Sequence, residues 1–338
     1  MPPTEGGGME IIMKIDYKAV VKEILDSRKE NGGIHAIYFA ACGGSKAGLT
    51  TADFFLKCES ATIDSHVYTA KEFVLCPPKA FDENCIVVTL SASGTTPEAV
   101  AAAKAAKEKG AVSITIVGKK DSPLAEQGDY VFFNGDEPKY QYSTCSMAVA
   151  LRFAVELLQQ AEGYEHYDDM QHGFDILDDV IKKAREYAEP GAIRFAEEHK
   201  DDKVLHVMAT GANYNVAYTT TTCILMECQW IHSNPIHSGE FFHGPFEVVD
   251  KEVPFLVLVG VGREREMDER AVDFLKKYGK RITVLDGKEF GIDILGPTVA
   301  EYLSPLVFTG VLSRYSHRLA DARNHSVYVR RYMWHVPY

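Results

Sequence analysis

Short apolar runs alternate along the chain with longer stretches in which apolar residues recur at helical spacing. The first clear case is the run 36–41, which is followed by a helical pattern that continues to Phe55. The predicted strands are 36–41, 85–90, 113–117, 130–133, 204–208, 255–260 and 281–286. The predicted helices are 15–29, the stretch through Phe55, 97–109, 143–160, 168–200, 213–232, 267–278 and an apolar one after Pro297. Strands separated by helices predict an α/β fold with parallel sheets flanked by helices.

The second half of the chain repeats the order of the first, at a spacing of 168 or 169 residues. The matching pairs are Ala41 and Ala209, Gly43 and Gly211, Gly110 and Gly279, and Gly118 and Gly287. These pairs indicate a duplicated α/β lobe. We therefore expect an N-terminal tail and helix (1–33), a first domain (34–165), a helical connector (166–200), a second domain (201–296) and a C-terminal helix and tail (297–338).

Composition narrows the class of protein. The 338 residues suit two domains, and 46% hydrophobic with 25% charged residues is a globular balance. The net charge of −12 argues against a nucleic-acid partner, since phosphate backbones require clustered Lys and Arg. No apolar run is long enough to span a bilayer, and no signal peptide precedes the first helix. The seven cysteines show no CxxC pair and the twelve histidines no HExxH, so we expect a cytoplasmic protein with neither metal nor other cofactor.

A hydroxyl-rich loop, Ser-Ala-Ser-Gly-Thr-Thr at 91–96, leaves one predicted strand and opens the helix at Pro97. The equivalent loop of the second lobe is Gly-Val-Gly-Arg at 260–263. Ligands bind beyond the carboxyl ends of parallel strands, and hydroxyls with a helix N-terminus suit a phosphate. The sequence therefore predicts one phosphate site, in the first lobe. The alternative is that these hydroxyls only cap the helix. Without GxGxxG or Walker A spacing, a dinucleotide or nucleoside triphosphate is disfavoured.

Two residues of the second lobe could transfer protons. Glu227 lies in an apolar helical stretch, where loss of solvation would raise its pKa and favour a general base; the alternative is a structural Glu paired with an Arg. His243 follows sixteen residues later in Ser-Gly-Glu-Phe-Phe-His-Gly-Pro. We expect Ser238 to cap this turn and Gly244 with Pro245 to end it, which would place His243 beside a ligand cleft as an acid. A single histidine is otherwise most often structural.

The SxSGxT loop and the GExxHGP segment, with Glu sixteen residues before the His, resemble the sugar isomerase (SIS) family in its tandem two-domain form. The resemblance covers about 34–338, and SGEFFHGPFEVV with the tail RRYM is most similar to bacterial fructosamine-6-phosphate deglycases of the fructoselysine-6-phosphate type. The layout is also that of the isomerase half of glucosamine-6-phosphate synthase. This resemblance implies two αβα sandwich domains.

The resemblance also implies roles for residues. The sugar and its phosphate would be bound by Gly43, Gly44, Ser45, Ser91, Ser93, Thr96 and Ser143. Glu227 would move a proton between C1 and C2, and His243 would open the sugar ring. In related enzymes this histidine crosses a dimer interface, so a homodimer or higher homo-oligomer with a shared active site is implied.

Three departures argue against a synthase: Ile224 and Cys145 each stand where the synthase has a lysine, and no glutamine-hydrolysing domain precedes Ile34. His335 in the tail is a candidate contact, though more plausibly a buried tail residue. The expected activity is cleavage of a 6-phosphorylated fructosyl-amino acid, an Amadori compound, to glucose 6-phosphate and an amino acid that the sequence does not identify. The alternatives are a phosphosugar isomerase or amino-sugar-phosphate deaminase, and a non-enzymatic sugar-phosphate sensor.

Overall fold

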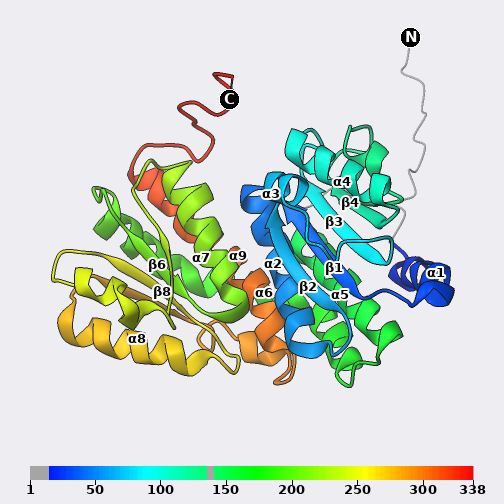
Figure 1. Ribbon diagram of the computed structural model, residues 1–338. Helices are drawn as coiled ribbons and strands as arrows, with labels where there is room; N and C mark the ends of the chain where they lie inside the picture. The colour runs from blue at the N-terminus through cyan, green and yellow to red at the C-terminus, as the bar shows by residue number, and fades with distance from the viewer. Residues whose placement is uncertain (1–14, 135–140, 338) are drawn as a thin grey trace, which may run out of the picture.

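Two parallel β-sheets, each flanked by helices, make up the computed structural model, which describes residues 15–134 and 141–337 (Figure 1). The first sheet has the order β2-β1-β3-β4-β5 and the second the order β7-β6-β8-β9, with every neighbouring pair parallel. The strands of the first sheet are β1 (Ala36–Ala41), β2 (Asp64–Thr69), β3 (Cys85–Ser91), β4 (Val112–Val117) and β5 (Tyr130–Phe133). Those of the second are β6 (His206–Ala209), β7 (Pro235–His237), β8 (Phe255–Val259) and β9 (Ile282–Asp286). The shared order of the first four strands is the order that a duplicated lobe predicts.

Helices cover both faces of each sheet. Around the first sheet these are α1 (Tyr17–Arg28), α2 (Gly43–Glu59), α3 (Ala70–Leu75), α4 (Pro97–Lys109) and α5 (Ser146–Ala161). Around the second they are α6 (Tyr167–His199), α7 (Tyr214–Thr219), α8 (Arg265–Tyr278) and α9 (Ala300–Ala322). The short 3₁₀ and π turns are η1 (Lys29–Asn31), η2 (Ala125–Gln127), η3 (Tyr142–Thr144), η4 (Gly211–Asn213), η5 (Thr220–Met226), η6 (Phe241–His243), η7 (Pro245–Val248) and η8 (Ile292–Leu295).

β1 shows why the predicted strands are continuous apolar runs. Its six residues are all buried, with Ile37 and Phe39 in the core beneath α2 and α5 and Tyr38 in the core beneath α3 and α4. A strand with helices over both faces has no solvent-facing side, so its sequence does not alternate.

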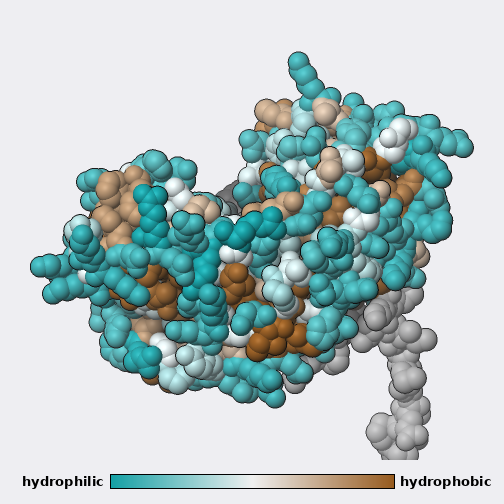
Figure 2. All heavy atoms as spheres, turned by 90° about the horizontal axis from the view of Figure 1, so that it is seen from below, coloured by the Kyte–Doolittle hydropathy of each residue, from teal (hydrophilic) through white to brown (hydrophobic). Residues whose placement is uncertain are grey.

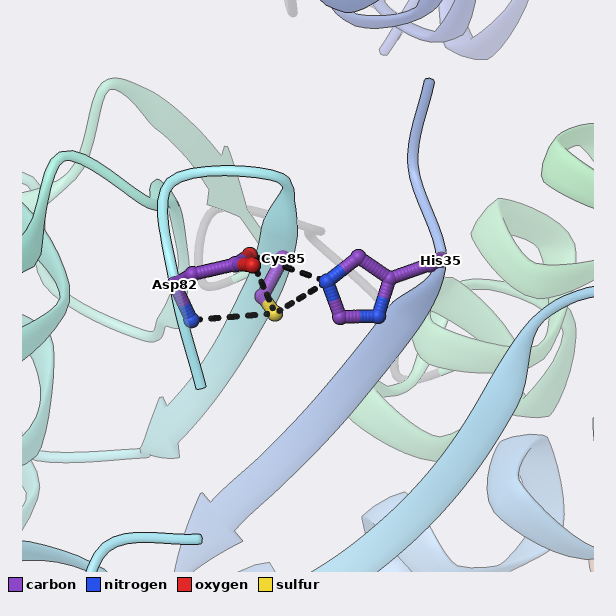
Figure 3. Close-up of side chains that lie close together, drawn as sticks. All are labelled: His35, Asp82 and Cys85. Carbon is purple, nitrogen blue, oxygen red and sulfur yellow. Dashed lines mark hydrogen bonds and ion pairs between the residues drawn. The ribbon is translucent and has the colours of Figure 1, made fainter. Parts of the chain in front are cut away.

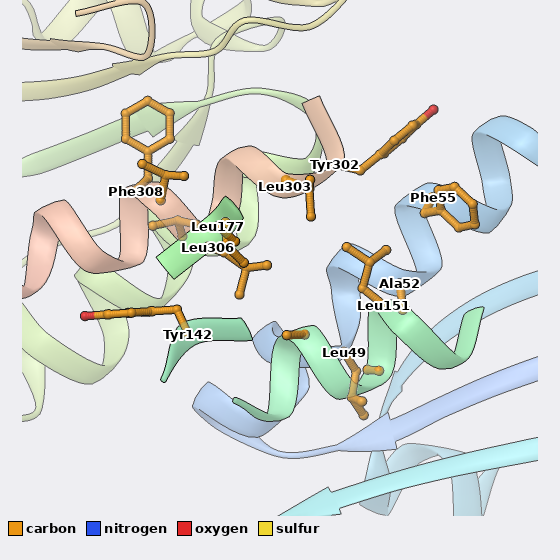
Figure 4. Packing of buried hydrophobic residues seen from close by; sticks show 14 of the residues in the cluster. Leu49, Ala52, Phe55, Tyr142, Leu151, Leu177, Tyr302, Leu303, Leu306 and Phe308 are labelled. Carbon is orange, nitrogen blue, oxygen red and sulfur yellow. The ribbon is translucent and has the colours of Figure 1, made fainter. Parts of the chain in front are cut away.

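One hydrophobic core runs through both lobes. Leu49 and Leu151 of the first lobe belong to the same buried cluster as Leu177, Leu303 and Phe308 of α6 and α9 (Figure 4). α6 and α9 pack along each other, so the segment predicted as a connector is a helix with one face in this core. The two lobes are therefore held together by apolar contact as well as by the chain.

The face of the molecule seen from below is mainly hydrophilic (Figure 2). On the face seen from below, hydrophobic side chains appear as scattered patches among hydrophilic ones (Figure 2). Within the described ranges, no helix combines the length and the apolar composition that crossing a membrane requires. None of the seven cysteines, which all lie within the described ranges, forms a disulfide bond.

The sequence prediction of one long helix over 213–232 is wrong. α7 ends at Thr219, the next residues form the π-helical turn η5, and the chain turns sharply at Trp230, where φ is 55°. The hydroxyls of Thr220 and Thr221 donate to the carbonyls of Val216 and Ala217, four residues back. Such bonds compete with the backbone ladder, and β-branched residues are weak helix formers. The π turn therefore ends the helix just before Glu227.

Candidate functional site

The hydroxyls of the loop after β3 gather at the N-terminus of α4. The Ser91 hydroxyl lies 2.9 Å from that of Thr96 and 3.4 Å from that of Ser93, and it accepts a 3.1 Å hydrogen bond from the Gly94 amide. Ser91 is buried, Thr96 is half-buried and Ser93 is exposed. The loop thus presents hydroxyls from a fixed base toward solvent, as a phosphate site requires.

The alternative prediction is that these hydroxyls only cap α4, but the hydroxyl at the N-cap position does not cap the helix. Thr96 occupies the N-cap position of α4, but its side chain makes no capping hydrogen bond to the backbone. It contacts Ser91 instead, and Pro97 at the first position carries no N–H. The next amides of α4, at Glu98 and Ala99, therefore remain uncapped by Thr96 at the positive end of the helix dipole.

The start of α2 lies beside this loop. β1 and β3 are neighbours in register, with Ala41 opposite Leu90, so Gly43, Gly44 and Ser45 leave the same edge of the sheet as Ser91. The structure therefore brings together all the predicted phosphate-binding residues except Ser143.

Ser143 is held elsewhere. It lies in η3, and its hydroxyl and amide both donate to Asp178 of α6. The Arg152 guanidinium donates to the Ser143 carbonyl at 3.3 Å. In this structure Ser143 fastens η3 to α6, and its role as a substrate contact remains a prediction.

The sequence predicts apolar surroundings for Glu227, but in the structure its carboxylate forms an ion pair with an arginine. Its Oε1 accepts a 2.7 Å hydrogen bond from Nε of Arg330, which comes from the C-terminal tail 103 residues later. The side chains are 25% and 11% exposed, so this ion pair is largely shielded. The alternative of a Glu paired with an Arg is therefore the geometry found, because the tail folds back over the end of η5.

Glu227 and Arg330 line one pocket of about 520 Å³ between η5 and the tail. Trp230, His232, Arg331 and Tyr332 line it as well. A pocket of this size, formed between a helical turn and the tail, fits a small molecule.

One contact joins the two halves of the site. A Cβ placed on Gly44 at the start of α2 would lie 3.4 Å from Sγ of Cys223, and the Gly44 backbone also hydrogen-bonds to this cysteine. Cys223 lies in η5, four residues before Glu227. The phosphate loop, the start of α2 and Glu227 therefore follow one another across the junction of the two lobes.

His243 lies at the end of η6 and is exposed. Its turn ends at Gly244, as the sequence predicts, and Pro245 begins the next turn, η7. The predicted capping by Ser238 is wrong, because its hydroxyl donates to Asp268 of α8 at 2.6 Å. Among the described residues the His243 side chain has no hydrogen-bond partner, so nothing in the single chain fixes the ring against Glu227.

The second lobe has carboxylates where the first has hydroxyls. Glu264 takes the N-cap position of α8, equivalent to that of Thr96 in α4, and its two carboxyl oxygens are buried without a hydrogen bond. Burial raises its pKa to about 7, with Glu301 and Asp268 adding to the effect. Burial likewise raises the pKa of Asp268 to about 6. Buried acids at this loop disfavour an anion, which supports a single phosphate site in the first lobe.

One group among the described residues could offer three ligand atoms to a metal ion: His35, Asp82 and Cys85, whose atoms lie within 4.8 Å of one another (Figure 3). Nε2 of His35 is 2.9 Å from Oδ1 of Asp82, and Sγ of Cys85 is 3.4 Å from the same oxygen. Burial raises the pKa of the Cys85 thiol to about 12, which favours a protonated sulfur that donates to the carboxylate. The group lies where β1 and β3 begin, at the opposite edge from the phosphate loop, and it ties these strand starts together.

Comparisons with known proteins identify the family to which the chain belongs. The SIS domain profile matches residues 34–158. The chain is 40% identical over 311 residues to fructosamine deglycase FrlB of Bacillus subtilis (strain 168), covering 90% of this chain and 93% of that protein. It is 26% identical over 302 residues to fructoselysine 6-phosphate deglycase of Escherichia coli (strain K12), covering 88% and 85%.

Solved structures share the fold. A crystal structure from Salmonella typhimurium LT2 aligns with a TM-score of 0.89 at 37% identity, covering 96% of this chain and all of that one. The C-terminal domain of glucosamine-fructose-6-phosphate aminotransferase from Francisella tularensis aligns with a TM-score of 0.74 at 18% identity, covering 92% and 93%, which shows a common fold.

Proposed function

Because the chain belongs to the SIS domain family, we propose that it is a deglycase that cleaves a 6-phosphorylated fructosyl-amino acid to glucose 6-phosphate and a free amino acid. The relative named fructosamine deglycase, similar over nearly the whole length of both proteins, supports this activity. The observation that supports the proposal is the contact between Gly44, at the start of α2, and Cys223, in the turn that precedes Glu227.

In the proposed binding mode, a phosphosugar would extend from the hydroxyl loop to Glu227. Its phosphate would bind the hydroxyls of Ser91, Ser93 and Thr96 with the first amides of α4, and Ser45 would contribute from α2. C1 and C2, at the far end of the open-chain sugar, would then reach Glu227. Binding of the remote phosphate holds these carbons in place for the reaction and lowers its entropic cost.

The reaction needs one base that acts on two adjacent carbons. Glu227, oriented by Arg330 through Oε1, would remove a C1 proton from the ketoamine while the C2 carbonyl oxygen gains a proton, giving an enaminol. Return of a proton to C2 leaves a Schiff base between C1 and the nitrogen. Water then adds to C1, the C–N bond breaks, and the aldose phosphate and the amine are released. These steps conserve electrons, so they require no external oxidant or reductant.

Replacement of the base gives the direct test. Glu227→Gln keeps the shape of the side chain but cannot accept the proton, so we expect glucose 6-phosphate release to fall at least a thousandfold while substrate still binds. Glu197→Gln, at an exposed ion pair with Lys200, is the matched control and should leave turnover unchanged. Retained turnover in Glu227→Gln would refute the proposed mechanism.

His243 would act in the site of a neighbouring copy, since it is exposed and unbonded in the single chain. To test this point, the Glu227→Gln and His243→Ala variants are mixed, unfolded and refolded together, so that dimers with one chain of each variant can form. In a two-fold dimer with shared sites, half of the molecules are mixed and each has one intact site, so about a quarter of the wild-type activity should return. No return of activity on mixing would place both residues in the same chain's site.

A further inference from the structure

The pocket behind Glu227 is built by the C-terminal tail. Three hydrogen bonds fasten the tail to the segment after η5: Arg330 Nε to Glu227 at 2.7 Å, Gln229 Nε2 to the carbonyl of His325 at 2.9 Å, and Arg323 Nη2 to the carbonyl of Gln229 at 3.2 Å. The indole of Trp230 packs edge to face on the His325 ring, with centroids 4.4 Å apart. The pocket walls therefore have fixed positions relative to Glu227.

The charge of this pocket is unbalanced. Glu227 is its single carboxylate among the lining residues, and Arg330 already pairs with it. Arg331 also lines the pocket, and no ion pair of this side chain is found within 15–134 and 141–337. A chain with a net charge of −12 thus keeps an uncompensated cation next to its proposed base.

The Arg331 guanidinium lies over the Trp230 indole. Its central carbon is 4.2 Å from the centroid of the ring, a distance at which the cation is attracted to the aromatic face. This contact does not use the N–H donors of the guanidinium, which can form the paired bonds that a carboxylate accepts. Arg331 is therefore arranged as a carboxylate receptor.

We propose that this pocket receives the amino-acid half of the substrate and that Arg331 binds its carboxylate. The inference rests on the proposed function and adds a specificity-determining residue to it. In the protein, the order is the phosphate loop, the contact of Gly44 with Cys223, Glu227 and then the tail pocket. The substrate has the matching order: the phosphate, the sugar carbons, C1 and then the amine. Every amino acid carries a carboxylate, so this contact favours fructosyl-amino acids over fructosyl derivatives of simple amines.

The test compares two substrates that differ in one carboxylate: the 6-phosphorylated fructosyl derivatives of alanine and of ethylamine. In Arg331→Gln we expect the KM for the alanine derivative to rise about tenfold with kcat little changed, and the KM for the ethylamine derivative to stay the same. Arg331→Lys keeps the charge without the planar fork and should fall between wild type and Gln.

Arg318→Gln, which removes an ion pair between the last turn of α9 and Glu189 of α6, is the matched control, because neither residue lines the pocket, and it should change neither KM. Equal effects of Arg331→Gln on the two substrates, or no effect on either, would overturn the inference while leaving the deglycase proposal in place. Failure of the wild-type protein to cleave either substrate would remove both. Thermal unfolding of the variants checks that the exposed substitution leaves the fold intact.

Discussion

Thr96 and Glu264 show at the level of single residues how two copies of one lobe diverge. Each occupies the N-cap position of the helix that follows the third strand of its lobe. Thr96 contributes to a group of hydroxyls, whereas Glu264 buries a carboxyl whose oxygens find no hydrogen-bond donor. A hydroxyl at this position therefore suits a loop that binds an anion, whereas a buried carboxyl at the equivalent position disfavours one.

The buried carboxyl of Glu264 makes stability depend on pH. Its pKa in the folded protein is raised to about 7, so the folded state holds the proton over a range in which the unfolded chain has released it. Its contribution is present below about pH 4.5 and is lost as the pH rises through 7. Glu264→Gln should thus raise the unfolding free energy by about 2 kcal/mol at pH 8 and by much less at pH 5.

Denaturant unfolding at the two pH values, with exposed Glu266→Gln as the control from the same helix, provides the measurement. An equal change at both pH values would show that the carboxyl of Glu264 is not the titrating group.

Single residues also mark the limit of what the sequence predicts. Ser91, Ser93 and Thr96 could be grouped from the sequence because they lie within six residues of one another. The pairing of Glu227 with Arg330 spans 103 residues, and the bond from Ser238 to Asp268 spans 30, so local patterns contain no sign of either. In the sequence, Arg331 is only part of the tail motif RRYM, because the pocket that it lines exists only when the tail folds back.

At the level of elements, the conformation of the loop between β3 and α4 depends on one glycine. Gly94 has φ of +68°, and a Cβ at this position would lie 2.1 Å from Oγ of Ser122. Neither the backbone conformation nor the space accommodates a side chain. The close approach of 94 and 122 therefore sets the shape of the loop that presents the hydroxyls.

Gly94→Ala should raise the KM for any phosphosugar at least tenfold, because the hydroxyl loop must move away from Ser122. Gly33→Ala is the matched control, since Gly33 also has positive φ (+79°) but nothing within 4 Å of its Cβ position. It should cost about 1 kcal/mol of stability through backbone strain and leave KM unchanged. If the two variants bind substrate equally well, the packing against Ser122 does not shape the site.

Strands are predictable from the sequence where apolar or aromatic residues follow one another without a break. The strand 36–41 and the strand 130–133 match the predicted ranges, because continuous or aromatic apolar runs distinguish them. β2 was missed because it is an edge strand with exposed positions, and β7 because it is three residues long. The break of 213–232 at η5 was missed because a run of threonines disrupts the helix without any Gly or Pro.

The arrangement of the two lobes explains, for the whole molecule, why one chain needs both. The first lobe supplies the hydroxyl loop and the start of α2, and the second supplies Glu227 and the tail pocket. The shared core of α6 and α9 fixes the lobes against each other, so these parts meet at the contact between Gly44 and Cys223. The α/β architecture could be predicted from the sequence, whereas this junction depends on packing between distant segments.

The most direct test of this account is glucose 6-phosphate release, coupled to a dehydrogenase, from a panel of 6-phosphorylated fructosyl-amino acids. Fructose 6-phosphate is run in the same assay, and glucosamine 6-phosphate is followed by the release of ammonia. We expect turnover of at least one fructosyl-amino acid and none of the two sugar phosphates. Turnover of glucosamine 6-phosphate or fructose 6-phosphate alone would contradict the deglycase and indicate a deaminase or isomerase. Tight binding of phosphosugars without any turnover would contradict catalysis itself and indicate a sensor.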